Sequence, residues 1–192
     1  MTTRRVIIGL AGRKRVGKDS IADILKGEFG FGSDSFAAPF RNFVYQLIGA
    51  AQDQEIDKEK TIDWLGASPR HLMQTLGNEW GRKMIHPEIW INALRNRLTL
   101  RNRLALSRSY WPLVITDVRY ENEAQTVRDM GGWIVHVRRP QLPYTDMHES
   151  ESDLVIQKSD GIVYNDDDLA ALQSTVRNAL IPAITELFGE ME

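Results

Sequence analysis

A short glycine-rich segment near the N-terminus has the residues needed to bind phosphate groups. Gly12 and Gly17 are separated by four residues and Lys18 follows directly, which matches the spacing G-x-x-x-x-G-K. Glycines allow the backbone to curl its N–H groups around phosphate oxygens, and the lysine ammonium adds a positive charge beside them. The segment, which also contains Arg15, therefore predicts a nucleotide phosphate loop rather than a glycine-rich turn beside a surface lysine.

The two residues after the lysine carry oxygen atoms that can serve a metal ion. Asp19 stands where the usual pattern has a serine or threonine that ligates magnesium, and the hydroxyl group comes one residue later, at Ser20. Asp19 can hold Mg²⁺ through a water molecule or can cap the following helix, and the sequence leaves both interpretations open. The chain has no cysteine and its four histidines are scattered, so a metal site would use oxygen ligands.

A second candidate group lies at the carboxyl end of an expected buried strand, where open α/β sheets bind their ligands. Asp117 at this position can lie near Mg²⁺ or near an attacking oxygen, and the alternative is that it caps the next helix. Chemistry between two phosphate groups gathers several negative charges, which calls for arginine side chains as clamps. The candidate arginines are Arg70, Arg82, Arg119, Arg138 and Arg139.

These residues need a sheet and helices to position them. Residues 6–10 form an apolar run typical of a buried strand, and residues 19–28 have apolar side chains at helical spacing, so the glycine loop is expected between a strand and a helix. The rest of the chain continues this alternation, which predicts an α/β fold with a mostly parallel sheet flanked by helices. The other expected strands are 35–39, 113–116, 133–137 and 161–164, and the other expected helices are 40–48, several within 61–106, 121–130 and 168–188.

The length of 192 residues favours a single domain with insertions. We expect a core of about 1–50 and 110–192, a helical insertion of about 51–109, and a mobile loop or lid at about 138–153, where the chain is polar and lacks a clear period. The composition, 42% hydrophobic and 26% charged with a net charge of −2, excludes a disordered or membrane-spanning chain. The N-terminus lacks the apolar length of a secretory signal, which predicts a cytoplasmic location.

Two other patterns have simpler explanations. The arginine-rich stretch 95–108 is interleaved with leucines, so it indicates an amphipathic helix with a solvated face rather than a surface for nucleic-acid polymers. Gln157-Lys158-Ser159-Asp160 is one residue away from the N-K-x-D motif of GTP-binding switch proteins, which remain an alternative of a different class.

Four segments of the sequence resemble the deoxynucleoside monophosphate kinases of tailed bacteriophages, and the resemblance covers most of the chain. Gly17-Lys18-Asp19-Ser20 looks like the G-K-D-[ST] variant of the phosphate loop in that family. Residues 69–82 are similar to its segment R-x-x-L-Q-x-L-G-T-E-x-x-R, with Met73 and Asn78 as departures. Residues 117–124 look like D-V-R-[FY]-x-N-E-A, and residues 148–151 are similar to an H-x-S-E element.

This resemblance implies a P-loop kinase fold and transfer of the γ-phosphoryl group of ATP to a deoxynucleoside monophosphate with Mg²⁺, in the host cytoplasm and as a homodimer. The nearest alternative is a dephospho-coenzyme A kinase-like enzyme, because residues 160–172 look similar there too, but the segment 70–82 argues against it. The implied transfer residues are Lys18, Asp117, Arg119 and Arg139, and ATP would contact Gly12, Arg15, Gly17, Lys18, Asp19 and Ser20. The acceptor would contact Arg70, Gln74, Arg82, Asp117, Arg119 and Glu151, and the metal would lie near Asp19 and Ser20.

Overall fold

The computed structural model describes residues 5–51, 54–104, 112–142 and 154–189. The chain divides into two compact units, one of residues 1–35 and 101–192 and one of residues 36–100. The second unit is helical and overlaps the stretch of about 51–109 in which we expected an insertion, but it begins at residue 36 and ends at residue 100. We refer to them below as the sheet unit and the helical unit.

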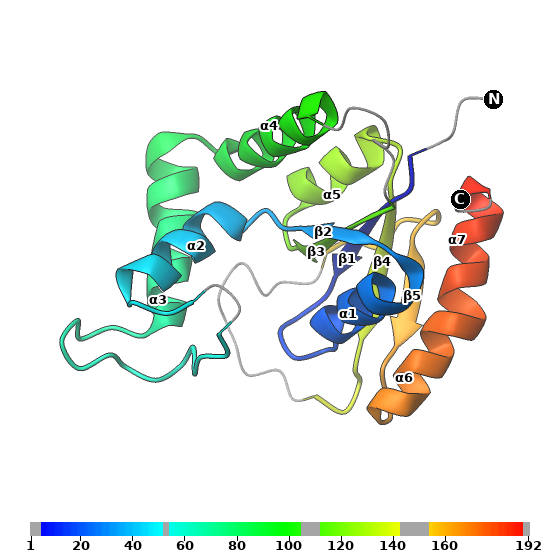
Figure 1. Ribbon diagram of the computed structural model, residues 1–192, viewed down its shortest axis with the longest axis horizontal. Coiled ribbons are helices and arrows are strands. Elements are labelled where there is room, and N and C mark those ends of the chain that lie inside the picture. Colours follow the sequence, from blue (N-terminus) through cyan, green and yellow to red (C-terminus); the bar gives the residue numbers. More distant parts are fainter. Residues whose placement is uncertain (1–4, 52–53, 105–111, 143–153, 190–192) are drawn as a thin grey trace. The chain divides into compact units, whose positions relative to one another are not determined.

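The sheet unit is built on five parallel strands in the order β2-β3-β1-β4-β5 (Figure 1). This arrangement confirms the predicted α/β fold class. All five strands are short and the central ones are buried, as expected for a parallel sheet covered on both faces. Their bounds are β1 Ile7–Ala11, β2 Gly32–Asp34, β3 Leu113–Val118, β4 Trp133–Arg138 and β5 Gly161–Tyr164.

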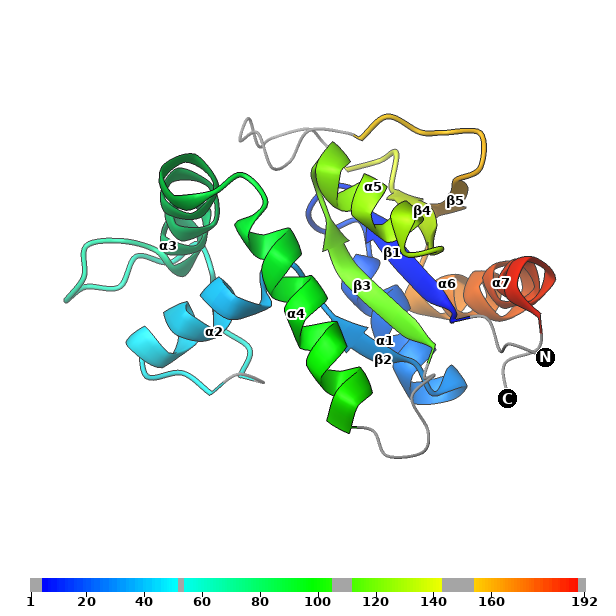
Figure 2. The same ribbon diagram turned by 90° about the horizontal axis from the view of Figure 1, so that it is seen from above.

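Helices cover both faces of this sheet. Figure 2 shows α5 (Glu121–Asp129) on one side of the strands and α1 (Lys18–Phe29) on the other. Alternate residues of β1 point to opposite faces, and Ile8 and Leu10 join the main apolar core beneath α1 and the C-terminal helices. That core also contains Ile21, Leu25, Val135, Val163, Val176 and Ile184.

The C-terminal helix is continuous but not uniform. It runs from α6 (Leu169–Thr175) through a π-helical segment, η3 (Val176–Leu180), into α7 (Ile181–Phe188). Pro182 lies in the first turn of α7 and has no N–H to donate to the preceding turn. A widened turn directly before a proline is one way in which a helix accommodates the missing hydrogen bond. The predicted helix 168–188 is confirmed, but its period did not reveal this change.

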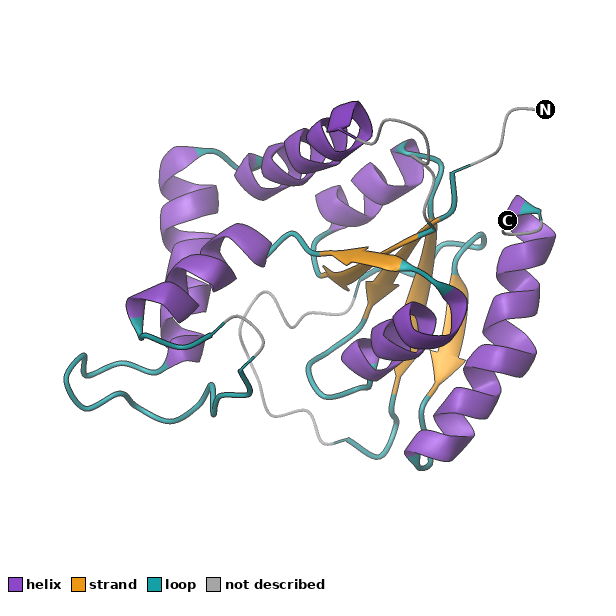
Figure 3. Cartoon of the chain, viewed as in Figure 1, coloured by secondary structure: helices purple, strands orange, loops and turns teal. Residues whose placement is uncertain are grey.

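The helical unit consists of helices joined by loops (Figure 3): α2 (Ala38–Leu47), α3 (Pro69–Gln74), the π-helical segment η1 (Thr75–Ile85) and most of α4 (Ile89–Leu104). The residues of α4 after Leu100 belong to the sheet unit. Trp90 is the packing centre of the helical unit. The Trp90 indole Nε1 donates a 2.7 Å hydrogen bond to the Gly77 carbonyl oxygen, and the Phe40 ring lies 4.7 Å from the Trp90 ring between centroids. Gly81 permits this packing, because a Cβ there would overlap the Trp90 ring.

Two sequence-based boundaries were wrong. The strand expected at 35–39 is instead β2, which ends at Asp34, and the following helix already begins at Ala38. Residues 61–68, where helices were expected to begin, form turns closed by a bridge between Ile62 and Ala67, and the helix starts only at Pro69, which occupies its first turn. Most of the expected lid, 143–153, lies outside the described residues. In the described part of the chain, every helix is too short or too polar to cross a membrane.

Candidate active site

The loop between β1 and α1 has a backbone that only glycine tolerates at two positions. Gly12 has φ 137° and Gly17 has φ 105°, both in the region that side chains disfavour. A Cβ on Gly12 would also overlap the Val137 carbonyl oxygen of β4. Arg15 has φ 63° as well, which places a non-glycine residue in the left-handed conformation. The loop therefore has the irregular shape expected of a phosphate cradle.

The side chain of Lys18 is held over this loop by hydrogen bonds to the backbone of the loop. Its Nζ donates hydrogen bonds of 2.6 Å to the carbonyl oxygens of Gly12 and Arg13, and the side chain is buried. Lys18 is also the first residue of α1, whose free N–H groups and dipole favour an anion at this end. The buried lysine and the helix terminus thus gather positive potential at the loop. The Arg15 side chain is exposed at its rim.

Asp19 and Ser20 follow in the first turn of α1. The residue at the N-cap position is Gly17, so Asp19 is the second residue of the helix and lies two residues past its N-cap. Asp19 is exposed and Ser20 is half-buried. The carboxylate of Asp19 still interacts favourably with the positive end of the helix dipole.

Asp117 and Arg119 lie beside the start of the loop. Ala11, the last residue of β1, pairs with Val118 of β3, and Asp117 and Arg119 flank Val118. The buried carboxylate of Glu123 accepts hydrogen bonds from the N–H groups of Arg119, at 2.8 Å, and of Tyr120. These bonds fix the backbone that carries Arg119 next to the phosphate loop.

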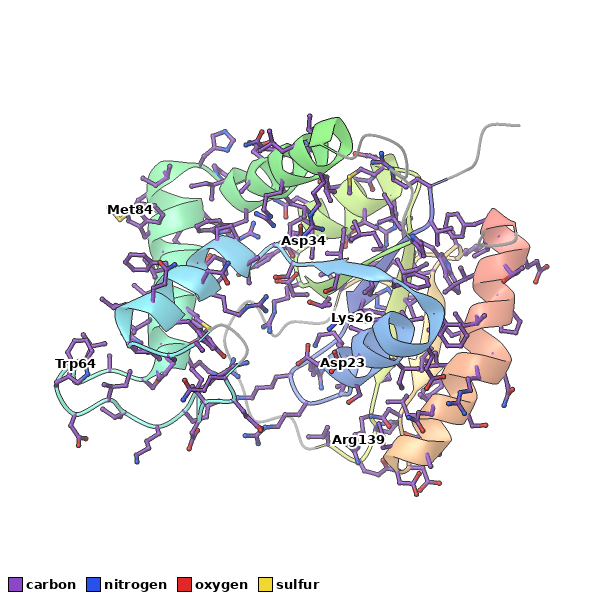
Figure 4. All side chains as sticks on the ribbon, viewed as in Figure 1. Asp23, Lys26, Asp34, Trp64, Met84 and Arg139 are labelled. Atoms are coloured by element: carbon purple, nitrogen blue, oxygen red, sulfur yellow. The ribbon has the colours of Figure 1, made fainter. Side chains whose placement is uncertain are left out.

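Arg138 and Arg139 come at the end of β4, on the other side of β1. Both side chains are exposed, and Figure 4 labels Arg139 beyond the carboxyl end of the sheet. The Arg138 carbonyl oxygen accepts the N–H of Asn165, the first residue after β5. Three strands of the sheet unit therefore bring predicted residues to the same edge. These are the loop after β1, Asp117 on β3 with Arg119 directly after that strand, and Arg138 at the end of β4 with Arg139 directly after it.

Asp34 is a carboxylate at this edge that the sequence analysis missed. It ends β2, which pairs with β3, and its side chain is 4% exposed. One of its oxygens accepts the Ser35 N–H at 2.8 Å, and the other lies 3.6 Å from Nη1 of Arg101 (Figure 4). The sequence could have indicated this residue as an acid at the end of a strand, as for Asp117. The strand was expected at 35–39, however, so Asp34 was placed before it and not at its carboxyl end.

A second buried carboxylate, Asp160, ties the segment before β5 to the sheet and to α5. It is 3.1 Å from Nε2 of His136 and 2.8 Å from Nη2 of Arg128, and it accepts the Gln157 N–H at 2.9 Å. Burial raises the pKa of Asp160, but the hydrogen bonds from Arg128, Gln157 and His136 outweigh this effect, so the pKa lies below its usual value. The Asp160 carboxylate is therefore ionised and has a structural role. By accepting the Gln157 N–H, it also closes the turn formed by residues 157–160, the segment that resembles the N-K-x-D motif of switch proteins.

In the helical unit, the predicted acceptor residues are held by local contacts. Arg70 Nε lies 2.7 Å from Oε1 of Glu59, and Arg82 Nη1 donates to the Pro87 carbonyl oxygen at 3.1 Å. Gln74 ends α3 four residues after Arg70, so the two side chains share a helix face. Glu151, together with the rest of the H-x-S-E element, lies outside the described residues.

The oxygen donors at the sheet edge suit a magnesium ion that is held mainly by its substrate. Within the described residues no three acidic or histidine side chains gather into a metal cluster. Mg²⁺ prefers oxygen ligands, keeps several waters, and in nucleotide sites uses one or two protein groups plus phosphate oxygens. Asp19, Ser20 and Asp117 have the oxygen atoms needed to bind Mg²⁺ in this way, together with phosphate oxygens of the nucleotide.

The parallel sheet, the glycine loop between β1 and α1, and the acid and arginine on the neighbouring strand together define a P-loop phosphotransferase of the α/β class. A solved protein from Chloroflexus aurantiacus, provisionally titled a kinase, supports this fold with a TM-score of 0.50 at 11% identity, over 95% of this chain and 99% of its own. The model of the family described as deoxynucleotide monophosphate kinase matches residues 52–176. The chain belongs to this family.

Viral relatives agree with this assignment. A protein of Acanthamoeba polyphaga mimivirus, provisionally named a deoxynucleotide monophosphate kinase, is 33% identical over 167 residues, which is 82% of this chain and 86% of that protein. The deoxynucleotide monophosphate kinase of Enterobacteria phage T4 is 28% identical over 81% of this chain, and the deoxynucleoside-5'-monophosphate kinase of Escherichia phage T5 is 31% identical over 59%. The matches span only 59% and 51% of these two phage proteins.

Proposed function

We propose that the chain transfers the γ-phosphoryl group of ATP to a deoxynucleoside monophosphate, giving ADP and the corresponding diphosphate. Family membership supports the acceptor class. The observation that carries the site assignment is the pairing of Ala11 with Val118, because it sets Asp117 and Arg119 beside a loop that is shaped for phosphate. A nucleotide kinase needs both parts, a cradle for the donor phosphates and charged groups for the group in transfer.

The reaction requires positioning more than proton transfer. An oxygen of the acceptor phosphate forms a bond to the γ-phosphorus, the bond to the oxygen bridging to the β-phosphate breaks, and its electron pair leaves with ADP. The attacking oxygen is already ionised at neutral pH, so no strong general base is needed. The protein must therefore bring two anionic nucleotides together and neutralise the charge that spreads over the phosphoryl oxygens.

The proposal gives the candidate site residues of the sheet unit the following roles. The loop from Gly12 to Gly17 and the start of α1 bind the ATP phosphates, and Lys18 stabilises charge on the group in transfer. Arg119 and Arg139 act as further phosphate clamps, with Arg15 at the rim of the loop. When bound, Mg²⁺ would supply positive charge that offsets the negative charge of the phosphate groups. Asp19, Ser20 and Asp117 are the residues that would hold it, directly or through water.

The helical unit is proposed to bind the acceptor. Arg70, Gln74 and Arg82 offer hydrogen-bond donors for a monophosphate or a base, and the contacts of Arg70 with Glu59 and of Arg82 with Pro87 orient their guanidinium groups. Glu151, in the predicted lid, would complete the acceptor site.

The resemblance to phage kinases also supports a homodimer, which light scattering would reveal as a particle of about twice the chain mass of 21.9 kDa.

A panel of acceptors tests the assignment directly. ATP with Mg²⁺ is incubated with each deoxynucleoside monophosphate, including dGMP and dTMP, and with dephospho-coenzyme A, and the formation of ADP and phosphorylated product is followed. We expect transfer to at least one deoxynucleoside monophosphate. Transfer to dephospho-coenzyme A alone would move the chain to the related enzyme class, and tight GTP binding without any acceptor would support a switch protein.

Replacing the loop lysine tests the site. Lys18→Ala should lower the transfer rate at least about 100-fold, because the transferring group loses its nearest cation, while circular dichroism shows a folded chain. Lys26→Ala is the matched control, since Lys26 lies on the same helix, is exposed and pairs with Asp23 on the helix surface at 3.0 Å (Figure 4). The control should keep the wild-type rate within about two-fold. A Lys18→Ala chain with wild-type activity would refute the assignment.

A further inference from the structure

Asn165 lies directly behind the phosphate loop, although it is 149 residues away from it in sequence. It is the first residue after β5, and it is 7% exposed. Its side-chain Nδ2 donates a 2.9 Å hydrogen bond to the carbonyl oxygen of Val16. Because a backbone carbonyl can only accept, the amide nitrogen of Asn165 must be the atom that faces it.

The backbone of Asn165 is fixed to the same edge of the sheet. Its N–H donates to the Arg138 carbonyl oxygen at 2.8 Å, next to the end of β4. The side-chain amide also fills the space beside Gly17, where a Cβ would overlap Nδ2. Asn165 therefore joins the ends of β4 and β5 to the last peptide group of the loop.

The hydrogen bond to Val16 has a directional consequence for the next residue. The structure has no cis peptide bonds in its described part, and in a planar trans peptide the C=O and the following N–H point in opposite directions. Holding the Val16 oxygen toward Asn165 thus turns the Gly17 N–H away from Asn165. The loop around it has unfavourable backbone angles at Gly12, Arg15 and Gly17, and such angles persist only where the surroundings fix them.

We propose that Asn165 is a positioning residue for the phosphate loop, whose side-chain amide holds the Val16 carbonyl toward itself, behind the loop, so that the Gly17 N–H is directed at the phosphates of ATP. This inference rests on the proposed function of the loop. Asn165 does not touch the reacting atoms itself. Its effect should therefore appear in ATP binding and leave acceptor binding unchanged.

Two replacements remove the donor in different ways. Asn165→Asp keeps the shape but presents an ionised carboxylate to the Val16 oxygen, and Asn165→Leu leaves that oxygen without a donor from this side chain. We expect the Kd of ATP, measured by calorimetry without acceptor, to rise roughly ten-fold or more in both variants. The KM of the deoxynucleoside monophosphate should stay within about two-fold, since the amide acts only on the donor site.

The matched controls are Asn178→Asp and Asn178→Leu. Asn178 lies on the adjoining C-terminal helix, is exposed, and donates to Ser174 Oγ at 3.0 Å, so its replacement tests the loss of an asparagine hydrogen bond away from the loop. Both controls should bind ATP like the wild type. Folded Asn165 variants with wild-type ATP affinity, or with equal increases for ATP and acceptor, would overturn the proposal.

A measurement on the wild-type chain covers the case in which the variants do not fold. In a ¹H–¹⁵N spectrum, the Gly17 amide proton should move downfield on addition of ATP and should not move on addition of adenosine, which lacks phosphates. An unmoved Gly17 resonance at saturating ATP would overturn the proposal. These binding results are independent of transfer, so a wild-type chain that binds ATP but phosphorylates no deoxynucleoside monophosphate would instead refute the proposed function.

Discussion

The buried carboxylate of Asp160 shows how one residue can hold several elements of the sheet unit. Its 1% exposed side chain contacts His136 on β4 and Arg128 at the end of α5, and Arg128 in turn lies 3.1 Å from Glu121. A buried ion pair is strongly destabilising to break from one side, because the partner charge remains buried without compensation. The network therefore locks the approach to β5, and through β5 the position of Asn165.

Acid should weaken this network in a predictable direction. The pKa of Asp160 is lower in the folded chain than in the unfolded one, so its contribution to stability is present above the unfolded pKa and is lost as the pH falls through the folded pKa. Wild-type stability, measured by urea unfolding, should fall as the pH drops below about 4. Asp160→Asn should be less stable at pH 7 and should lose less on acidification.

Asp166→Asn provides the control for this comparison, because Asp166 is an exposed carboxylate that follows β5, whereas Asp160 is buried and precedes it. It should keep both the stability and the acid dependence of the wild type. If Asp160→Asn showed the same acid dependence as the wild type, the carboxylate of Asp160 would not be the group that titrates.

At the scale of elements, the segments next to the loop could be predicted because each is a short apolar run ended by glycine or by a charged residue. β5 was found at its predicted bounds, and β1, β3 and β4 within one or two residues. β2 could not be placed in this way, because Gly32-Ser33-Asp34 has little intrinsic strand preference and is extended by pairing with β3. The π-helical turns also escaped prediction: η3 lies directly before Pro182, and η1 contains Gly77 and Gly81, which contact Trp90.

Two helical glycines should respond in opposite ways to alanine. Gly81→Ala should destabilise the chain by about 1–3 kcal/mol, because the new methyl group would overlap the Trp90 ring and the Leu76 carbonyl oxygen, 2.9 Å away. A Cβ at Gly27 on α1 would have no atom within 4 Å among the described residues outside its own stretch of helix, so Gly27→Ala should stabilise by about 0.5–1 kcal/mol through helix propensity. Denaturant unfolding of both variants checks the sign, and a stabilised Gly81→Ala chain would contradict the packing described around Trp90.

At the scale of the whole molecule, the proposal assigns the ATP phosphates to the sheet unit and Arg70, Gln74 and Arg82 of the acceptor site to the helical unit. Their boundaries at 35/36 and 100/101 reflect contacts between residues far apart in sequence, which composition and periodicity do not report. The candidate site followed the same pattern. Local spacing was enough to predict the loop and Lys18, whereas Asp34 and Asn165 gain their positions from strand pairing and from a hydrogen bond across the fold.

Hydrogen exchange should separate the two tasks. ATP alone should protect backbone amides at residues 12–20, and an accepted deoxynucleoside monophosphate alone should protect amides within 69–85, because bound ligands suppress local opening. Mass spectrometry of peptides after timed labelling would resolve the two segments. Acceptor-dependent protection confined to the sheet unit would contradict the assignment of the acceptor site to the helical unit.

The packing around Trp90 also gives the helical unit a built-in optical probe. Trp90 is 6% exposed and hydrogen-bonded, Trp80 is 43% exposed with its ring 6.4 Å from that of Trp90, and Trp64 is 67% exposed. A buried indole emits at shorter wavelengths than one in water, so these three side chains have distinguishable fluorescence. Trp111 and Trp133 belong to the sheet unit, so a chain with Trp111→Phe and Trp133→Phe would let intrinsic emission follow events in residues 36–100 without a label, in real time and at low concentration.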